Sequence, residues 1–219
     1  IIVLEACEVK NNILEKLLDS RVDYIYMQDK NPVFHRTKYL NVLSKLVVTP
    51  FLAVWDADVI VSCQQIISSI QLLRHGGADI VYPYDGRFLD TTLKYRKLFI
   101  VSSDIKSLYA VQNHFVLPYG IYAIGGGFLA NRFMYSCSGG ENENFYGWGP
   151  EDQERLKRWE ILEYNIKRVE GPMFHLSHPR GINSCFGDYK REEDSIKELL
   201  RICKITKKEL SDKNKHWNW

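Results

Sequence analysis

The stretch that most constrains this chain is a hydrophobic segment that runs directly into two acidic residues. Phe51–Val54 is typical of a buried strand, and Asp56 and Asp58 follow it one residue apart. Because side chains alternate along a strand, we expect both carboxylates on the same side. A divalent cation would relieve their mutual repulsion and the cost of burying them. The alternative is that both acids cap a turn or the next helix, and these residues alone leave the choice open.

Strand-like and helix-like segments alternate through the first 82 residues. The strand patterns cover 1–5, 22–27, 51–55 and 78–82. The helical patterns cover 11–20, 34–48 and 66–73. This order predicts an α/β fold with a mostly parallel central sheet flanked by helices, and ligands bind at the carboxyl ends of such strands. From 84 to 120 the pattern loosens, with one short helix expected at 103–110, and a single charged helix is expected at 188–210.

A glycine-rich loop in the second half of the chain leads into two more acids. Trp148 lies between two glycines, and Pro150 precedes Glu151 and Asp152. Trp148 could stack on a sugar ring, and one of the acids could act as a general base. The structural alternative is that Pro150 and the two acids simply begin a helix, where proline and negative charge are both favourable.

Two histidines lie on an extended segment near residue 175. His175 and His178 are three residues apart, and either could supply an imidazole to a metal ion held by Asp56 and Asp58. An isolated histidine is more often an ordinary surface or core residue, so this hypothesis depends on the tertiary fold.

Composition narrows the protein class. The net charge is +2, from 29 Lys and Arg against 27 Asp and Glu, which gives no support for a nucleic-acid partner. The five cysteines are scattered, with no Cys-x-x-Cys pair, so we expect reduced thiols in a cytoplasmic protein. No apolar run reaches membrane-spanning length, and no integral membrane segment is expected.

Taken together, four segments resemble the GT-A-fold glycosyltransferases, and more narrowly the β4-galactosyltransferases and the bacterial chondroitin-polymerase-type transferases. Phe34–Asn41 resembles the family's Phe-x-Arg-x-x-x-Leu-Asn helix, and Trp55–Asp58 resembles its Asp-x-Asp metal motif. Gly125–Phe128 followed by Gly147–Asp152 resembles its Gly-Gly … Gly-Trp-Gly-x-Glu-Asp signature. Pro172–His178 lies where the family places its metal-binding histidine. The order and spacing fit over nearly the whole chain.

The resemblance implies inverting transfer of a hexose or N-acetylhexosamine from a UDP-sugar donor to a hydroxyl of a saccharide acceptor, with Mn²⁺ or Mg²⁺. Asp58 would bind the metal, and Asp56 would reach the ribose or the metal. His175 is the first choice for a further metal ligand and His178 the second. Asp152 would be the general base.

The resemblance also implies binding roles for other residues. Glu151 would hold the acceptor or donor sugar. The nucleotide or donor would contact Arg36, Lys38 and Trp55. The sugar would contact Trp148, Gly126 and Gly127. The expected layout is a single domain over 1–219, with a nucleotide- and metal-binding half (1–82), an acceptor-binding and catalytic half (83–187), and a C-terminal helix and tail (188–219).

Two departures from the family pattern qualify these expectations. Gln153 stands where the vertebrate enzymes carry a third acid, which favours the bacterial branch. The resemblance also implies polysaccharide biosynthesis and a cytoplasmic location, with a peripheral position at the inner membrane face as an option. The family's first strand, which holds the uracil, would precede Ile1, so the nucleotide pocket is expected to be incomplete. The alternatives are a non-catalytic sugar- or nucleotide-binding module of the same fold, and a nucleotidyltransferase.

Overall fold

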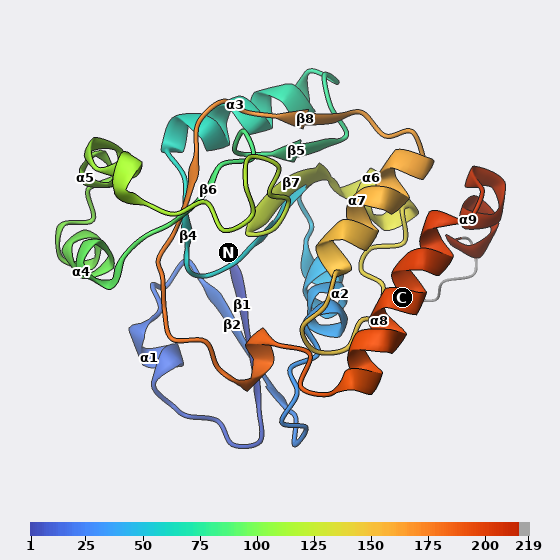
Figure 1. Cartoon of the computed structure of the whole chain (residues 1–219), viewed down its shortest axis with the longest axis horizontal. Coiled ribbons are helices and arrows are strands. Elements are labelled where there is room, and N and C mark those ends of the chain that lie inside the picture. Colours follow the sequence, from blue (N-terminus) through green and yellow to red (C-terminus); the bar gives the residue numbers. More distant parts are fainter. Residues whose placement is uncertain (215–219) are drawn as a thin grey trace.

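A four-stranded sheet lies at the centre of the computed structural model, which describes residues 1–214 (Figure 1). Its strand order is β3 (Phe51–Trp55), β7 (Gly127–Asn131), β5 (Ile80–Tyr82) and β8 (Ile166–Arg168). Strand β7 runs antiparallel to both β3 and β5, and only β5 and β8 are parallel. The fold is α/β, as expected, but this sheet is mixed rather than mostly parallel.

The mixed sheet follows from the position of β7. Phe128, Leu129 and Ala130 are all buried, as suits a strand that is covered on both faces. Gly126, with φ of +86°, lies at the turn before it and allows the chain to enter between β3 and β5. The apolar residues 128–130 are typical of a strand, but no sequence pattern sets its direction.

Two smaller sheets complete the β-structure of the described residues. Strands β1 (Ile2–Cys7) and β2 (Asp23–Gln28) form a parallel pair. Strand β9 (Met173–His175) pairs antiparallel with β4 (Val59–Ile60) and parallel with β6 (Phe88–Asp90). The sheet of β4, β9 and β6 joins three distant parts of the sequence and positions residues of the candidate site.

The helix expected at 11–20 is reduced to one turn, α1 (Leu14–Leu17). Ile13 and Leu17 are exposed, so the apolar stripe has no surface to cover, and Asn12 has a positive φ of 59°. Helical stability in proteins comes mostly from such packing. Without it the pattern produces only a single turn.

The other helices of the first half match expectation. Helix α2 spans Arg36–Leu46, and α3 spans Cys63–Arg74 and begins at a capping box formed by Ser62 and Gln65. Helix α3 contacts β5 and β7 and runs above β5 and β8 in Figure 1. Helices α6 (Arg132–Cys137) and α7 (Glu151–Ile161) lie on the right of the sheet in the same view.

The loosely patterned region contains more structure than expected. The short helix expected at 103–110 is α5 (Ile105–Ala110), but α4 (Leu93–Ser102) and β6 were not predicted. Helix α4 carries large apolar side chains on opposite sides, so no amphipathic period marks it. A 3₁₀ turn, η1 (Gln112–His114), follows α5.

The single helix expected at 188–210 is divided into α8 (Tyr189–Cys203) and α9 (Lys207–Asn214). A short 3₁₀ turn, η2 (Ile182–Ser184), precedes them. The last five residues of the expected C-terminal segment, 215–219, lie outside the described residues. Within residues 1–214, no helix is both long and apolar enough to cross a membrane.

Candidate functional site

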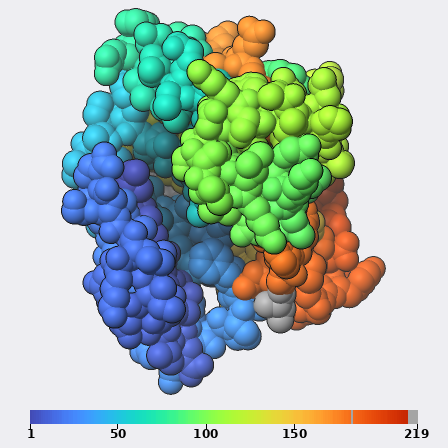
Figure 2. Space-filling model, turned by 90° about the vertical axis from the view of Figure 1, so that its left-hand side faces the viewer, coloured from blue at the N-terminus to red at the C-terminus, as the bar shows by residue number. Residues whose placement is uncertain are grey.

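A cavity of about 570 Å³ opens between the N-terminal strands and the central sheet. Figure 2 shows the molecule hollowed between the blue N-terminal segment and the green segment around residue 100. Its walls come from β1, α2, the turn after β3, and the chain around β9. The volume lies within the usual range for small-ligand sites. The lining residues that the sequence singled out are Arg36, Trp55, Asp56, Asp58, Trp148, His175 and His178.

Asp58, His175 and His178 converge on one wall of this cavity. One donor atom from each lies within 4.8 Å of the others. Oδ2 of Asp58 is 2.9 Å from Nε2 of His178 and 3.5 Å from Nε2 of His175. The β4–β9 pairing brings them together, because Val59 lies opposite His175 and the backbone N–H of Leu176 donates to the carbonyl of Asp58 at 2.7 Å.

Asp90 supports this group and was missed by the sequence analysis. In the β6–β9 register Asp90 lies opposite His175, and its Oδ1 is 2.8 Å from Nδ1 of that imidazole. Hydrogen bonds to Asp58 first, and also to Asp90, raise the pKa of His175. The His175 bond in turn lowers the pKa of Asp58. No motif marks Asp90, since only strand pairing brings it to the site.

Asp56 does not join Asp58, contrary to the alternation argument. Residues 56–59 form a turn, closed by a 3.3 Å hydrogen bond from the Val59 N–H to the Asp56 carbonyl, so the two-residue period of a strand does not apply. Oδ1 of Asp56 instead accepts a 2.8 Å hydrogen bond from Nη2 of Arg36. Partial burial raises the pKa of Asp56, and the Arg36 charge offsets part of that rise.

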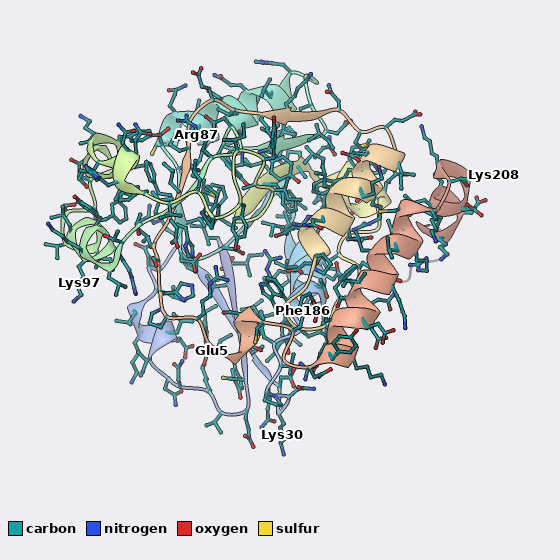
Figure 3. All side chains as sticks on the ribbon, viewed as in Figure 1. Glu5, Lys30, Arg87, Lys97, Phe186 and Lys208 are labelled. Carbon is teal, nitrogen blue, oxygen red and sulfur yellow. The ribbon has the colours of Figure 1, made fainter. Side chains whose placement is uncertain are left out.

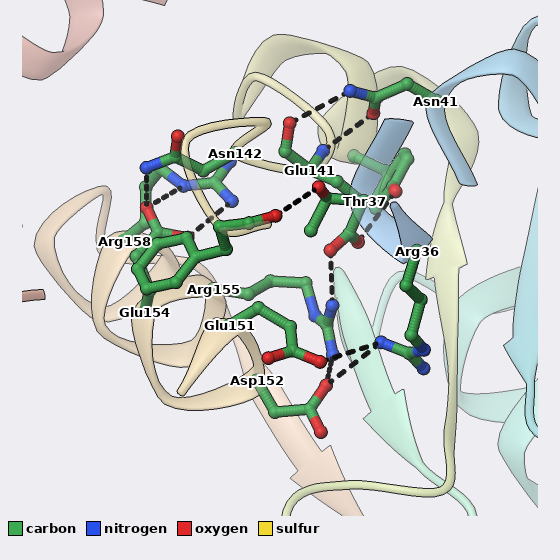
Figure 4. A network of polar contacts seen from close by, with 12 residues as sticks. Arg36, Thr37, Asn41, Glu141, Asn142, Glu151, Asp152, Glu154, Arg155 and Arg158 are labelled. Carbon is green, nitrogen blue, oxygen red and sulfur yellow. Dashed lines mark hydrogen bonds and ion pairs between the residues drawn. The ribbon is translucent and has the colours of Figure 1, made fainter. Parts of the chain in front are cut away.

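Arg36 also contacts the two acids that begin α7 (Figure 4). Its Nη1 lies 3.6 Å from Oε1 of Glu151 and 3.7 Å from Oδ1 of Asp152. Burial, followed by the Asp152 charge, raises the pKa of Glu151 to about 7. Arg36 Nη1 and Glu151 Oε2 are buried and make no hydrogen bond with the described residues. Buried polar atoms of this kind are rare, and a bound polar ligand would satisfy them.

A buried guanidinium holds Asp152 in place. Nη2 of Arg155 contacts Oδ1 of Asp152, and its Nη1 donates to Oε2 of Glu141 at 2.5 Å (Figure 4). Tyr135 donates to the other oxygen of Glu141 at 2.8 Å, and Asn41 exchanges two hydrogen bonds with the Glu141 backbone. Asn41 is the last residue of the Phe-x-Arg-x-x-x-Leu-Asn segment, so this motif anchors the loop before α7. Glu141 itself was not predicted.

Five of the expected site residues do not line the cavity, namely Lys38, Gly126, Gly127 and the two α7 acids, Glu151 and Asp152, which contact the lining residue Arg36. Lys38 is exposed, and its ammonium lies 6.0 Å from the centre of the Tyr39 ring. Gly126 and Gly127 are buried and lie behind the cavity wall. A Cβ on Gly126 would lie 2.6 Å from the sulfur of Met173, and one on Gly127 would lie 3.0 Å from the Trp55 ring. The glycines are needed for this close packing.

The two tryptophans do line the cavity. Trp55 is fixed by a 3.2 Å hydrogen bond from Nε1 to the Val59 carbonyl. Trp148 is 41% exposed and meets Phe186 edge to face, with ring centres 4.8 Å apart. Phe186, labelled in Figure 3, lies in the segment before α8. Trp148 therefore presents a supported but open ring, which suits stacking on a sugar.

Residues 106–179 match the model of a family described as the N-terminal domain of galactosyltransferase. The expected resemblance to galactosyltransferases is thus confirmed for this segment. It contains β7, Trp148, the two acids of α7, and both histidines. Asp56, Asp58 and Arg36 lie outside the match and reach the same cavity through the fold.

The solved structures that are similar to this chain include two of Drosophila β1,4-galactosyltransferase 7. One is a mutant in complex with manganese, UDP-Gal and xylobiose, at 15% identity, and the other is the catalytic domain with xylobiose, at 16%. Each comparison has a TM-score of 0.43 and covers 76% of this chain and 63% of the other. The chain thus spans less than two thirds of either chain it matches. A search of curated proteins gave no match.

Proposed function

We propose that this chain is a metal-dependent inverting glycosyltransferase domain that moves a hexose or N-acetylhexosamine from a UDP-sugar to a saccharide hydroxyl. The observation that carries the proposal is the convergence of Asp58, His175 and His178 on a cavity that also exposes Arg36 and Trp148. One wall of the cavity offers metal ligands, and the others offer a cation for phosphate and a ring for a sugar.

The donor set fits a divalent transition metal better than Mg²⁺. Two imidazole nitrogens and one carboxylate oxygen are within reach of one ion, and Mg²⁺ prefers an all-oxygen shell. Asp90 holds the proton on Nδ1 of His175, which leaves the Nε2 lone pair facing Asp58. Mn²⁺ is the cation we propose. When bound, such a cation would stabilise the diphosphate of the leaving UDP.

Asp152 is the proposed general base. Both of its ion pairs, with Arg36 and Arg155, use Oδ1, so Oδ2 remains to accept a proton. In the proposed reaction the acceptor hydroxyl gives its proton to Oδ2 while its oxygen forms the bond to the anomeric carbon. The bond from that carbon to the UDP oxygen breaks, and the configuration inverts.

Glu151 and Arg36 are proposed to hold the substrates. With its pKa raised to about 7, Glu151 carries a proton on a large fraction of molecules near neutral pH and can donate a hydrogen bond to a sugar oxygen. The guanidinium of Arg36 is suited to a phosphate oxygen, where a charge-assisted hydrogen bond is strong. Asp56 orients Arg36 through their 2.8 Å contact.

Calorimetric titration of UDP with and without Mn²⁺ tests the donor site. Binding that requires Mn²⁺ and disappears in Asp58→Ala is the expected result. Asp19→Asn, at an exposed acid that pairs with Arg21, is the matched control and should bind normally. Mn²⁺-independent binding would contradict the metal assignment.

Turnover separates the enzyme from a non-catalytic module of the same fold. We expect UDP-sugar hydrolysis or transfer that falls at least about a hundredfold in Asp152→Asn, as removal of a general base usually costs. UDP binding should survive that change. Mn²⁺-dependent UDP binding without turnover of any UDP-hexose or UDP-N-acetylhexosamine would favour the binding module instead.

A further inference from the structure

Helix α4 exposes four aliphatic side chains and two lysines along one face. The exposed fractions are 55% for Leu93, 50% for Leu98, 56% for Ile100 and 87% for Val101. Lys94 and Lys97 are also exposed, and Figure 3 shows Lys97 at the outer edge of the molecule. At 3.6 residues per turn these six side chains occupy an arc of about 160°. We call them the α4 surface.

The opposite side of α4 already supplies its internal packing. Tyr95 and Phe99 pack against the buried cluster of Leu89, Leu108, Phe115 and Phe174. Nη1 of Arg96 donates to the Ser177 carbonyl at 3.2 Å. The aliphatic residues of the α4 surface are therefore not needed to hold the helix in place. In Figure 1, α4 and α5 project from the left of the molecule, away from the central sheet.

The charge of the α4 surface has one sign. Helix α4 contains no acidic residue, and the two acids nearest to its ends are both engaged. Asp90 bonds to His175, and Asp104 accepts a hydrogen bond from the Lys106 backbone as the cap of α5. Exposed aliphatic residues interspersed only with lysines are typical of a helix that lies in the interface of an anionic bilayer, where the ammonium groups reach the head groups.

Helix α8 shows what an ordinary water-facing helix of this chain looks like. Ile196 and Leu200 are exposed there to a similar degree, at 45% and 51%. Acids accompany them, and Lys197 pairs with Glu193 at 2.8 Å. The absence of any acid on the α4 surface therefore distinguishes it from a second exposed helix with similar aliphatic residues.

We propose that the α4 surface docks the protein on an anionic lipid bilayer. Leu93, Leu98, Ile100 and Val101 would enter the interface, and Lys94 and Lys97 would contact lipid phosphates. The surface is tied to the candidate site, because the Thr91 N–H just before α4 donates to the His175 carbonyl at 3.0 Å. Docking would hold the cavity near the membrane, within reach of substrates carried there.

Vesicle co-sedimentation tests the proposal. The probes are phosphatidylcholine vesicles with and without about 30% phosphatidylglycerol, at about 0.1 M salt, where surface charge still acts over roughly 10 Å. We expect partitioning at least about tenfold stronger on the anionic vesicles, and weaker at high salt. Lys94→Glu with Lys97→Glu should reduce it about tenfold or more. Ile100→Ser with Val101→Ser should reduce it on the same vesicles.

The matched control is Ile196→Ser with Leu200→Ser on α8, which should leave partitioning unchanged. Far-UV circular dichroism and Mn²⁺-dependent UDP binding show that each variant is folded. If the lysine variant does not fold, the proposal is tested by how partitioning of the unmodified protein depends on lipid charge and salt. Equal partitioning on both vesicles, no partitioning, or an equal loss in the α8 control overturns the proposal. Light scattering tests whether a second copy of the chain covers the α4 surface instead. A dimer that is lost in the α4 variants, together with no vesicle binding, would make this a self-association surface.

Discussion

The Nδ1 atom of His175 lies 2.8 Å from Oδ1 of Asp90, although the two residues are 85 positions apart in the sequence. The contact is possible because β6 and β9 are parallel neighbours in register. It places the ring proton on Nδ1 and turns Nε2 toward Asp58. Asp90 thus decides which nitrogen of His175 is available as a ligand.

Removing Asp90 should weaken metal binding. We expect Asp90→Ala to lower the affinity for Mn²⁺ in the presence of UDP about 10- to 100-fold, the usual effect of losing such a supporting carboxylate. Asp90→Asn should recover part of the loss, because its amide oxygen can still accept the Nδ1 proton. Calorimetry measures both. Wild-type affinity in Asp90→Ala would show that the contact does not orient the ligand.

Breaking the buried Arg155–Glu141 pair should destabilise the fold. Both side chains are only 1% exposed, so Glu141→Gln leaves a poorly compensated guanidinium in the interior. We expect a loss of about 3 kcal/mol in the free energy of unfolding, measured by urea denaturation. Glu160→Gln, which breaks the exposed pair with Lys157, should cost under about 1 kcal/mol. Equal effects in the two variants would contradict this account of the interior network.

The raised pKa of Glu151 predicts a specific pH dependence of stability. Its ordinary pKa is 4.5 and its folded value is about 7, so between these values the folded state binds more protons than the unfolded state. Stability contributed by this group therefore falls as pH rises through that window, and the loss is complete above it. We expect Glu151→Gln to abolish a decline of about 1 to 3 kcal/mol.

Urea denaturation at about pH 5 and about pH 8 measures this difference between the wild type and the variant. Glu160→Gln is again the matched control, since it removes an exposed carboxyl and should decline in parallel with the wild type. Parallel decline in Glu151→Gln as well would mean that Glu151 is not protonated in the folded protein near neutral pH.

Gly126 should tolerate no side chain. Its φ is +86°, and a Cβ would lie 2.6 Å from the Met173 sulfur and 3.0 Å from the Phe88 ring. We expect Gly126→Ala to lower the free energy of unfolding by about 2 kcal/mol or more, from backbone strain and overpacking together. Gly181→Ala, at a negative φ with open space around the position, should change it by less than about 1 kcal/mol. Thermal unfolding of the pair compares them directly.

Several parts of the candidate site could be predicted from the sequence because their signals are local. The apolar run into Asp56 and Asp58, the proline and acids at the start of α7, and the histidines near β9 all depend on neighbours within a few residues. The sugar-binding role predicted for Gly126 and Gly127 rested on an equally local signal, and the structure buries both glycines away from the cavity. A Gly-Gly-Gly run indicates unusual backbone freedom, but whether it faces a ligand or the Met173 side chain depends on residues far away in the sequence.

The sequence by itself determined most of the strands and helices, though not α4, β6 or the short length of α1, and it determined which segments carry ligand-type side chains, because hydrophobic period and capping act over short distances. Only the tertiary structure decided that β7 runs antiparallel between β3 and β5, that a turn separates Asp56 from Asp58, and that Asp90 and Glu141 support the site. The physical reason is that strand register and buried charge pairing bring together residues 14 to 100 positions apart. No local pattern encodes which of these partners will meet.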